Sequence, residues 1–177
     1  MNQNHSIFFE EEQRFRQTWL WVILLISIVP VVILMIYGTY QQLALGQPFG
    51  NHPVSDTTLI WLGPAMILLM LSVPILLWTM KLHIIVDREF LHIRFFPFVK
   101  RDIPLNDILE WKAKVYHPLR DYGGWGIRWG FKGKAYNVSG NRGVQLVLIK
   151  NKKLLIGSQK PDALAQAITT AKSLITH

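Results

Sequence analysis

Side chains that could carry out acid–base or metal chemistry are sparse in this chain of 177 residues, which has six histidines and no cysteine. The lack of cysteine excludes a catalytic thiol, a disulfide scaffold and cysteine-based metal sites. No pair of histidines has metal-ligand spacing with a carboxylate. His117 and Asp121 form the one histidine–aspartate pair expected on a loop, and no convincing nucleophile accompanies them. We therefore expect no catalytic residues, no metal, no cofactor and no enzymatic activity.

The stretch from Tyr122 to Gly130, YGGWGIRWG, is the most unusual in the sequence. Its glycine spacing matches neither the dinucleotide fingerprint nor a phosphate-binding loop, and no helical pattern follows it. One interpretation is a turn whose glycines adopt positive φ angles or allow close backbone approach. The other is a recognition loop, because tryptophan gives large rigid contact area and arginine gives forked donors. The residues expected to bind a partner are Arg120, Tyr122, Trp125, Arg128, Trp129 and Arg142.

Basic residues dominate the second part of the chain. The whole sequence has a net charge of +8, and from Lys81 onward 17 basic residues face 7 acidic ones. Such a surface is either simply solvated or attracted to anionic lipid headgroups, at about 1 kcal/mol per basic residue near the bilayer. The residues expected to face lipid are Lys81, Arg88, Lys100 and Arg101. Nucleic acid is a less favoured partner, because the chain also carries membrane spans.

Two uncharged apolar runs precede this basic part, residues 19–37 and 59–80. A helix of about 20 residues crosses the ~30 Å hydrocarbon core of a bilayer, so each run is long enough to span it. We predict transmembrane helices over residues 19–40 and 59–80, joined by a short outside loop and preceded by an N-terminal tail, residues 1–18. Aromatic residues suited to the headgroup level lie near the ends of both runs: Trp19, Trp21, Tyr37, Tyr40, Trp61 and Trp78.

Two alternatives to a pair of spans were weighed. Buried core helices of this length would rarely lack every charge and carry aromatic residues at both ends. A cleaved signal peptide fits poorly, because the first run is long, follows three glutamates and lacks a small-residue cleavage site. The spans contain no ionisable residue, which disfavours a transporter or channel built by this chain alone.

The distribution of basic residues predicts the orientation. The connector, residues 41–58, has no lysine or arginine, whereas both flanking segments carry them. The positive-inside rule then places both termini in the cytoplasm, which predicts an integral protein of the bacterial inner membrane.

From residue 81 the pattern changes to short alternating segments separated by turn residues, followed by one amphipathic stretch that begins at Pro161. The expected strands cover residues 82–86, 90–96, 99–103, 108–116, 126–131, 135–138, 144–149 and 153–156. Ser139 to Gly143 has the turn chemistry of a hairpin tip. We predict a membrane α + β protein: a two-helix transmembrane hairpin, then a cytoplasmic domain, residues 81–177, that forms a PH-like split β-barrel closed by a C-terminal helix.

Three segments resemble a known group of proteins: GGWGIR at residues 123–128, AYNVSGNRGV at 135–144 and LLIGSQKP at 154–161. They are similar to small bacterial and cyanobacterial membrane proteins of unknown function with two transmembrane helices and a C-terminal PH-like domain. The resemblance implies the PH-like fold and membrane attachment, and it implies no ligand.

These observations favour a non-enzymatic adaptor or assembly factor that presents a PH-like module to a membrane or cytoplasmic protein. Two alternatives remain open. One is a domain that binds anionic lipid, and the other is an accessory subunit whose spans pack against the helices of a membrane complex.

Overall fold

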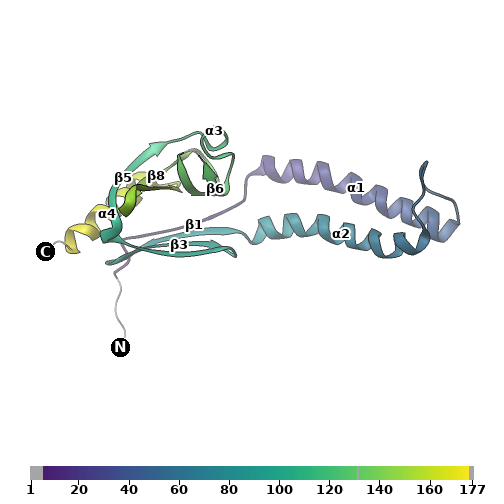
Figure 1. Cartoon of the computed structure of the whole chain (residues 1–177), viewed down its shortest axis with the longest axis horizontal. Helices are drawn as coiled ribbons and strands as arrows, with labels where there is room; N and C mark the ends of the chain where they lie inside the picture. Colours follow the sequence, from purple (N-terminus) through teal and green to yellow (C-terminus); the bar gives the residue numbers. More distant parts are fainter. Residues whose placement is uncertain (1–5, 131, 176–177) are drawn as a thin grey trace, which may run out of the picture. The chain divides into compact units, whose positions relative to one another are not determined.

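A computed structural model describes residues 6–130 and 132–175 of the chain. The chain forms two compact units, one of residues 16–78 and the other of the segments on either side, up to Phe15 and from Thr79 onward. Figure 1 shows the two long helices of the first unit and the strands of the second. Phe131, which ends a predicted strand, and the chain ends at residues 1–5 and 176–177 lie outside the described residues.

Two helices make up the first unit, α1 (Thr18–Leu45) and α2 (Asp56–Thr79). Both are long and apolar enough to cross a membrane, which indicates membrane association. None of their large apolar side chains is buried and most are exposed, which contradicts the alternative of buried core helices. The helices pass the predicted ends at residues 40 and 59, because α1 continues until Gly46 adopts a left-handed φ of 65°.

Small residues and one aromatic ring organise the packing inside this unit. Gly38 and Gly63 are the buried residues of the two helices. A Cβ on Gly38 would come within 2.5 Å of the Phe49 ring, so glycine is needed for the connector to pack on α1. The Gln42 amide donates to the carbonyl of Val54 at 2.6 Å and to the carboxylate of Asp56 at 2.7 Å. The connector is therefore tied to α1 by both an apolar and a polar contact.

The second unit contains two β-sheets and two helices. One sheet is antiparallel in the order β1-β2-β3-β4, and the other has the order β5-β8-β9-β7-β6. The first sheet comprises β1 (Phe9–Arg14), β2 (Lys81–Val86), β3 (Phe90–Phe96) and β4 (Val99–Pro104). The second comprises β5 (Ile108–Val115), β6 (Gly126–Gly130), β7 (Gly133–Asn137), β8 (Arg142–Leu148) and β9 (Lys152–Gly157). The helices are α3 (Pro118–Tyr122) and α4 (Pro161–Ile175), and single turns η1 (Leu105–Asp107) and η2 (Ile149–Asn151) join strands.

The core lies where the inner faces of the two sheets meet α4. Phe95 on β3 and Tyr136 on β7 are fully buried, with ring centroids 6.5 Å apart. The apolar stripe predicted for α4, Leu164, Ile168, Ala171 and Ile175, is buried at its first three positions, whereas Ile175 is exposed. The helix contacts strands of both sheets. The eight strands and the closing helix predicted from residue 81 onward are confirmed, with small shifts at their ends.

Strand β1 was missed by the sequence analysis, which treated residues 1–18 as a tail. Residues Phe9 to Arg14 instead pair with the whole of β2, from Phe9 opposite Val86 to Arg14 opposite Lys81. Phe9, Gln13 and Phe15 are buried, and the Gln13 amide donates to the carbonyl of Gly157 at 2.8 Å. The three consecutive glutamates obscure the alternation of apolar and polar residues that is typical of a strand, because Glu11 lies on the same side of the strand as the buried Phe9 and Gln13.

The hairpin tip predicted at residues 139–143 is wrong, because β7 and β8 are not neighbours. Strand β9 lies between them, antiparallel to β8 and parallel to β7. The segment is therefore a connection between non-adjacent strands. Strands β8 and β9 form a hairpin, and Lys150 and Asn151 in its turn have positive φ angles of 62° and 54°.

Candidate functional site

Helix α3 and strand β6 carry most of the residues expected to bind a partner. Pro118 begins this short helix, and Gly123 ends it with a φ of 73°. A Cβ on Gly130 would lie 2.5 Å from the carbonyl oxygen of Asp121, so its glycine allows β6 to lie directly against α3. The turn interpretation of the glycine-rich stretch is confirmed by the positive φ angles at Gly123, Gly124 and Gly126.

Asp121 fixes the position of α3. Its Oδ2 accepts the backbone N–H of His117 at 3.1 Å, and its Oδ1 accepts the ammonium of Lys132 at 2.9 Å. These two hydrogen bonds, the backbone one first, lower the pKa of the Asp121 carboxyl to about 2. The ring of His117 instead contacts the guanidinium of Arg120 at 3.2 Å. His117 and Asp121 therefore make a structural helix cap with no acid–base pair between their side chains.

Two of the expected binding residues serve other contacts. Tyr122 is only 3% exposed and packs edge-on against Tyr116, with ring centroids 5.9 Å apart. Burial raises the pKa of its hydroxyl to about 12. The Arg142 guanidinium binds the carboxylate of Asp162 at 3.0 Å, which directs it toward the start of α4. Tyr122 is therefore a core residue beneath the glycine-rich stretch, and its ring is not available to a partner.

The remaining residues are exposed on α3 and β6, and this region is here named the α3–β6 surface: Leu119, Arg120, Arg128 and Trp129. Arg128 and Trp129 are neighbours on β6, so their side chains lie on opposite sides of this edge strand. Trp129 is 73% exposed and Leu119 is 68% exposed. The Lys134 ammonium lies 4.4 Å from the centroid of the Trp129 ring. Trp125 lies beside this surface, half-buried, with its indole N–H donating to the carbonyl of Gly140 at 2.9 Å. Sequence analysis missed Leu119, because α3 was not predicted.

The same surface includes an open sheet edge. Strand β6 is the last strand of its sheet and pairs with β7 on one side. In the described part of the chain no strand pairs with its other side. An edge strand of this kind can accept an extended peptide through backbone hydrogen bonds. Exposed aromatic, aliphatic and arginine side chains next to that edge give the arrangement of a protein-binding surface.

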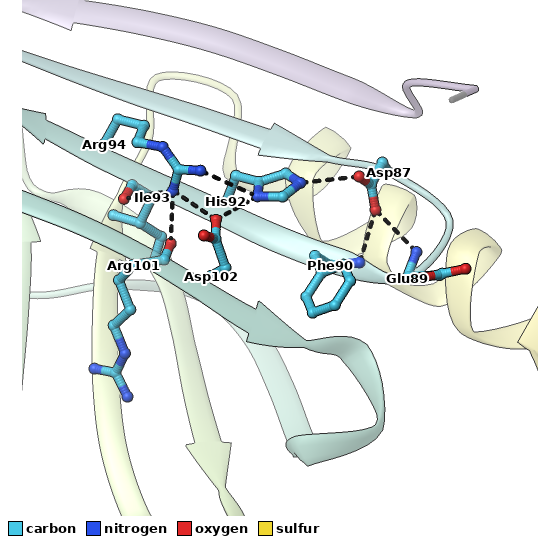
Figure 2. A network of polar contacts seen from close by, with 8 residues as sticks. All are labelled: Asp87, Glu89, Phe90, His92, Ile93, Arg94, Arg101 and Asp102. Carbon is cyan, nitrogen blue, oxygen red and sulfur yellow. Dashed lines mark hydrogen bonds and ion pairs between the residues drawn. The ribbon is translucent and has the colours of Figure 1, made fainter. Parts of the chain in front are cut away.

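A second polar cluster occupies the outer face of the first sheet (Figure 2). His92 on β3 lies between two carboxylates: its Nε2 is 2.9 Å from Asp87 and its Nδ1 contacts Asp102. Arg94 binds Asp102 at 2.6 Å, and Asp87 accepts the backbone N–H groups of Glu89 and Phe90. Because both ring nitrogens of His92 are occupied, the imidazole has no free nitrogen to act as a base. The ion pairs of this cluster therefore connect β3 with β4 and with the β2–β3 turn.

The charges of this cluster reinforce one another. Burial lowers the pKa of His92, but the hydrogen bonds to Asp102 and Asp87 outweigh it and raise the pKa above its usual value of 6.5. Burial raises the pKa of Asp87, but the hydrogen bonds from the Phe90 N–H and from His92 outweigh this effect and lower the pKa. The pKa of Asp102 is lowered mainly by its hydrogen bond with Arg94. The two carboxylates therefore favour the imidazolium form of His92.

This cluster predicts a pH-dependent stability. A raised pKa in the folded state means that the His92 contribution is complete below about pH 6.5 and lost as the pH rises through the folded pKa. For a partly exposed pair we expect a loss of up to about 1 kcal/mol. Chemical unfolding of the detergent-solubilised full chain at pH 6 and pH 8 measures it. His92→Gln and Asp102→Asn should both flatten this pH dependence, and an unchanged slope in both variants would contradict the assignment.

The four residues expected to face lipid are not gathered in one place. Lys81 begins β2 and Lys100 lies on β4, both near the end of the sheet where the chain leaves for the helices. Arg88 lies in the turn at the far end of β2, and its guanidinium donates to the Ser6 hydroxyl at 2.8 Å. Arg101 lines a hollow of ≈ 190 Å³ beside Lys150. At about 3.3 Å per residue, Arg88 is about 20 Å from Lys81, so one flat surface does not hold all four.

The fold and these surfaces define a class of protein: two long apolar helices followed by a two-sheet domain with exposed aromatic and basic side chains, and no metal-ligating group of three side chains among residues 6–130 and 132–175. The model of a family of unknown function, DUF6141, matches residues 3–175, and the chain belongs to this family. No curated protein matches the sequence.

Proposed function

We propose that this chain is a non-enzymatic membrane adaptor whose soluble unit binds a protein partner through the α3–β6 surface. In this proposal α1 and α2 span the bacterial inner membrane and both termini lie in the cytoplasm. The lack of basic residues between Gln41 and Thr58 supports the orientation, because such residues are retained on the cytoplasmic side.

The fold proposed for the soluble unit is a PH-like split barrel. Two sheets of four and five strands pack face to face, and the C-terminal helix packs against both of them. Modules of this shape leave sheet edges on which an extended peptide can be added. The open edge of β6 is the edge assigned to the partner here.

The exposure of Trp129 is the observation that carries the proposal. A tryptophan that is 73% exposed on an edge strand gains little from folding, whereas a partner that covers it removes a large apolar area from water. Arg120 on α3 and Arg128 on β6, both exposed near this strand edge, supply donors for a carboxylate or a backbone carbonyl. We therefore expect the bound segment to be an extended peptide with acidic residues.

Site-specific photocrosslinking in intact cells tests the proposal. A photoreactive phenylalanine analogue placed at Trp129 is expected to give one dominant crosslinked protein. The matched control is the same analogue at Leu109, which is exposed on β5 at the opposite edge of the same sheet. Equal crosslinking from both positions, or none from Trp129 in well-expressed protein, would contradict the assigned surface.

A second candidate function, binding to anionic lipid, is favoured by the positions of Lys81 and Lys100. Both lie at the end of the first sheet that continues directly into the helices. Lipid contact at that end is compatible with a partner on the α3–β6 surface, because the two surfaces belong to different sheets.

A further inference from the structure

The turn between β3 and β4 exposes two aromatic rings, Phe96 and Phe98. With Pro97 between them, these residues are named here the aromatic tip. Phe96 is 53% exposed and Phe98 is 58% exposed, whereas the preceding Phe95 is fully buried. The N–H of Phe98 donates to the carbonyl of Phe95 at 2.8 Å, which closes the turn and keeps both rings outside the core. Two adjacent exposed phenylalanines form an apolar patch that the fold itself does not use.

The strand register places this tip close to the point where the chain enters both helices. Arg14 on β1 pairs with Lys81 on β2, and Lys81 pairs with Phe96 on β3. Lys81 comes two residues after Thr79, the last residue of α2. Adding about 7 Å of chain to one interstrand step of about 5 Å puts Phe96 within about 13 Å of the end of α2. This limit comes from the covalent chain and the sheet alone.

The same ends of the two helices carry the side chains of a membrane interface. The Arg16 guanidinium lies 3.5 Å from the centroid of the Trp78 ring, and Trp21 packs edge-on against Trp78 at 5.5 Å. Tryptophan rings at helix ends mark the headgroup level of a bilayer, and that layer is about 5–7 Å thick on each side. A group about 13 Å from the helix end along chain and sheet can therefore reach the headgroups.

Charge at this end of the sheet complements an anionic membrane. Lys81, Arg14 and Lys100 lie beside the tip, and Glu12 pairs with the first two at 2.8 Å and 2.7 Å. One carboxylate facing three cations leaves a positive rim around the aromatic rings. Apolar rings within a basic rim are typical of segments that lie in the bilayer interface.

We propose that the aromatic tip inserts into the headgroup region of the membrane that the helices cross, with Lys81 and Lys100 bound to anionic lipid. The inference rests on the proposed spanning of the membrane by α1 and α2. Together with the two chain crossings at Phe15 and Thr79, the tip gives the soluble unit a third attachment to the bilayer.

Single-cysteine labelling of the full chain tests this inference, because the natural sequence has no cysteine. Phe98→Cys carries an environment-sensitive fluorophore in protein reconstituted into vesicles of phosphatidylcholine and phosphatidylglycerol. Leu119→Cys, at an exposed site on α3, is the matched control, and Ile26→Cys within α1 reports the span itself. The Phe98 label should be blue-shifted and quenched by spin-labelled lipid, while the Leu119 label should be neither.

The outcomes separate this inference from the proposed span. A quenched Ile26 label with an unquenched Phe98 label would overturn membrane insertion of the tip and leave the spans intact. A blue-shifted Phe98 label that lipid quenchers do not reach would assign the tip to a contact between copies, which also overturns it. An unquenched Ile26 label would overturn both proposals.

A charge reversal gives a second, independent readout. Lys100→Glu combined with Phe98→Cys should reduce the quenching in vesicles that contain phosphatidylglycerol. Lys112→Glu, an exposed lysine on β5, should leave it unchanged. Equal quenching in all three proteins would overturn the role of Lys100.

Discussion

Residues 79–177 expressed alone are expected not to fold, although they contain eight of the nine strands and the closing helix. Strand β1 precedes the helices in the sequence but belongs to the soluble unit, where it pairs with β2 along its whole length. Its removal exposes the edge of β2 and the buried side chains beneath it. A fragment that begins at residue 86 is also expected not to fold, because it lacks nearly all of β2 as well.

The size of the effect follows from what β1 buries. Removing Phe9 and Phe15 forfeits about 1.5–3 kcal/mol of hydrophobic stabilisation for each ring. The buried amide hydrogen bond from Gln13 to Gly157 is lost as well. So are the two hydrogen bonds that Glu11 accepts from the hydroxyl of Ser158 at 2.5 Å and the N–H of Gln159 at 2.8 Å. A small domain is stable by about 5–15 kcal/mol in total, so these losses are sufficient to unfold it.

A fusion that restores β1 is the matched control. Because Arg14 lies opposite Lys81, residues 6–15 can be joined to residues 79–177 by a short turn that replaces the helices. We expect this fusion to give dispersed NMR amide signals and a cooperative thermal transition, and residues 79–177 alone to give neither. A folded, cooperative domain without β1 would refute the assignment.

Trp129→Ala is expected to weaken partner binding by about 30-fold or more. Tryptophan at the centre of an interface contributes about 2 kcal/mol or more when truncated, and each 1.4 kcal/mol is tenfold in affinity. Folding should be unaffected, because the ring is largely exposed and its contact with Lys134 is at the surface. Affinity for the protein captured by crosslinking, measured by calorimetry in mild detergent, gives the number.

Leu109→Ala is the control for this loss, because Leu109 is also a large exposed apolar residue of the same sheet. It should change the affinity by less than about twofold, as for residues outside an interface. Arg128→Ala should weaken binding less than Trp129→Ala, and its effect should shrink with added salt. Binding that survives Trp129→Ala unchanged would remove the α3–β6 surface as the site.

The sequence by itself determined the elements whose patterns are local. Uncharged runs of about 20 residues predict the two long helices, because length and composition alone decide whether a helix can cross a bilayer. Alternation and turn residues predict the strands from residue 81 onward, and the apolar stripe of Leu164, Ile168, Ala171 and Ile175 predicts α4. The glycines near Trp125 predict positive φ angles, because glycine alone adopts them freely.

The tertiary structure decided what depends on residues far apart in the chain. Strand β1 forms because it pairs with the edge of β2, and the paired residues Arg14 and Lys81 are 67 positions apart in the chain. The three glutamates of β1 obscure the alternating pattern that would predict a strand. Tyr122 is buried because it packs against Tyr116 in a cluster with Ala135 and Leu155, whereas its local sequence suits a surface loop. The clustering of His92 with Asp87 and Asp102, and of the aromatic tip with the chain crossings, follows from strand register. Register is set by which faces are buried together, and no local pattern specifies that.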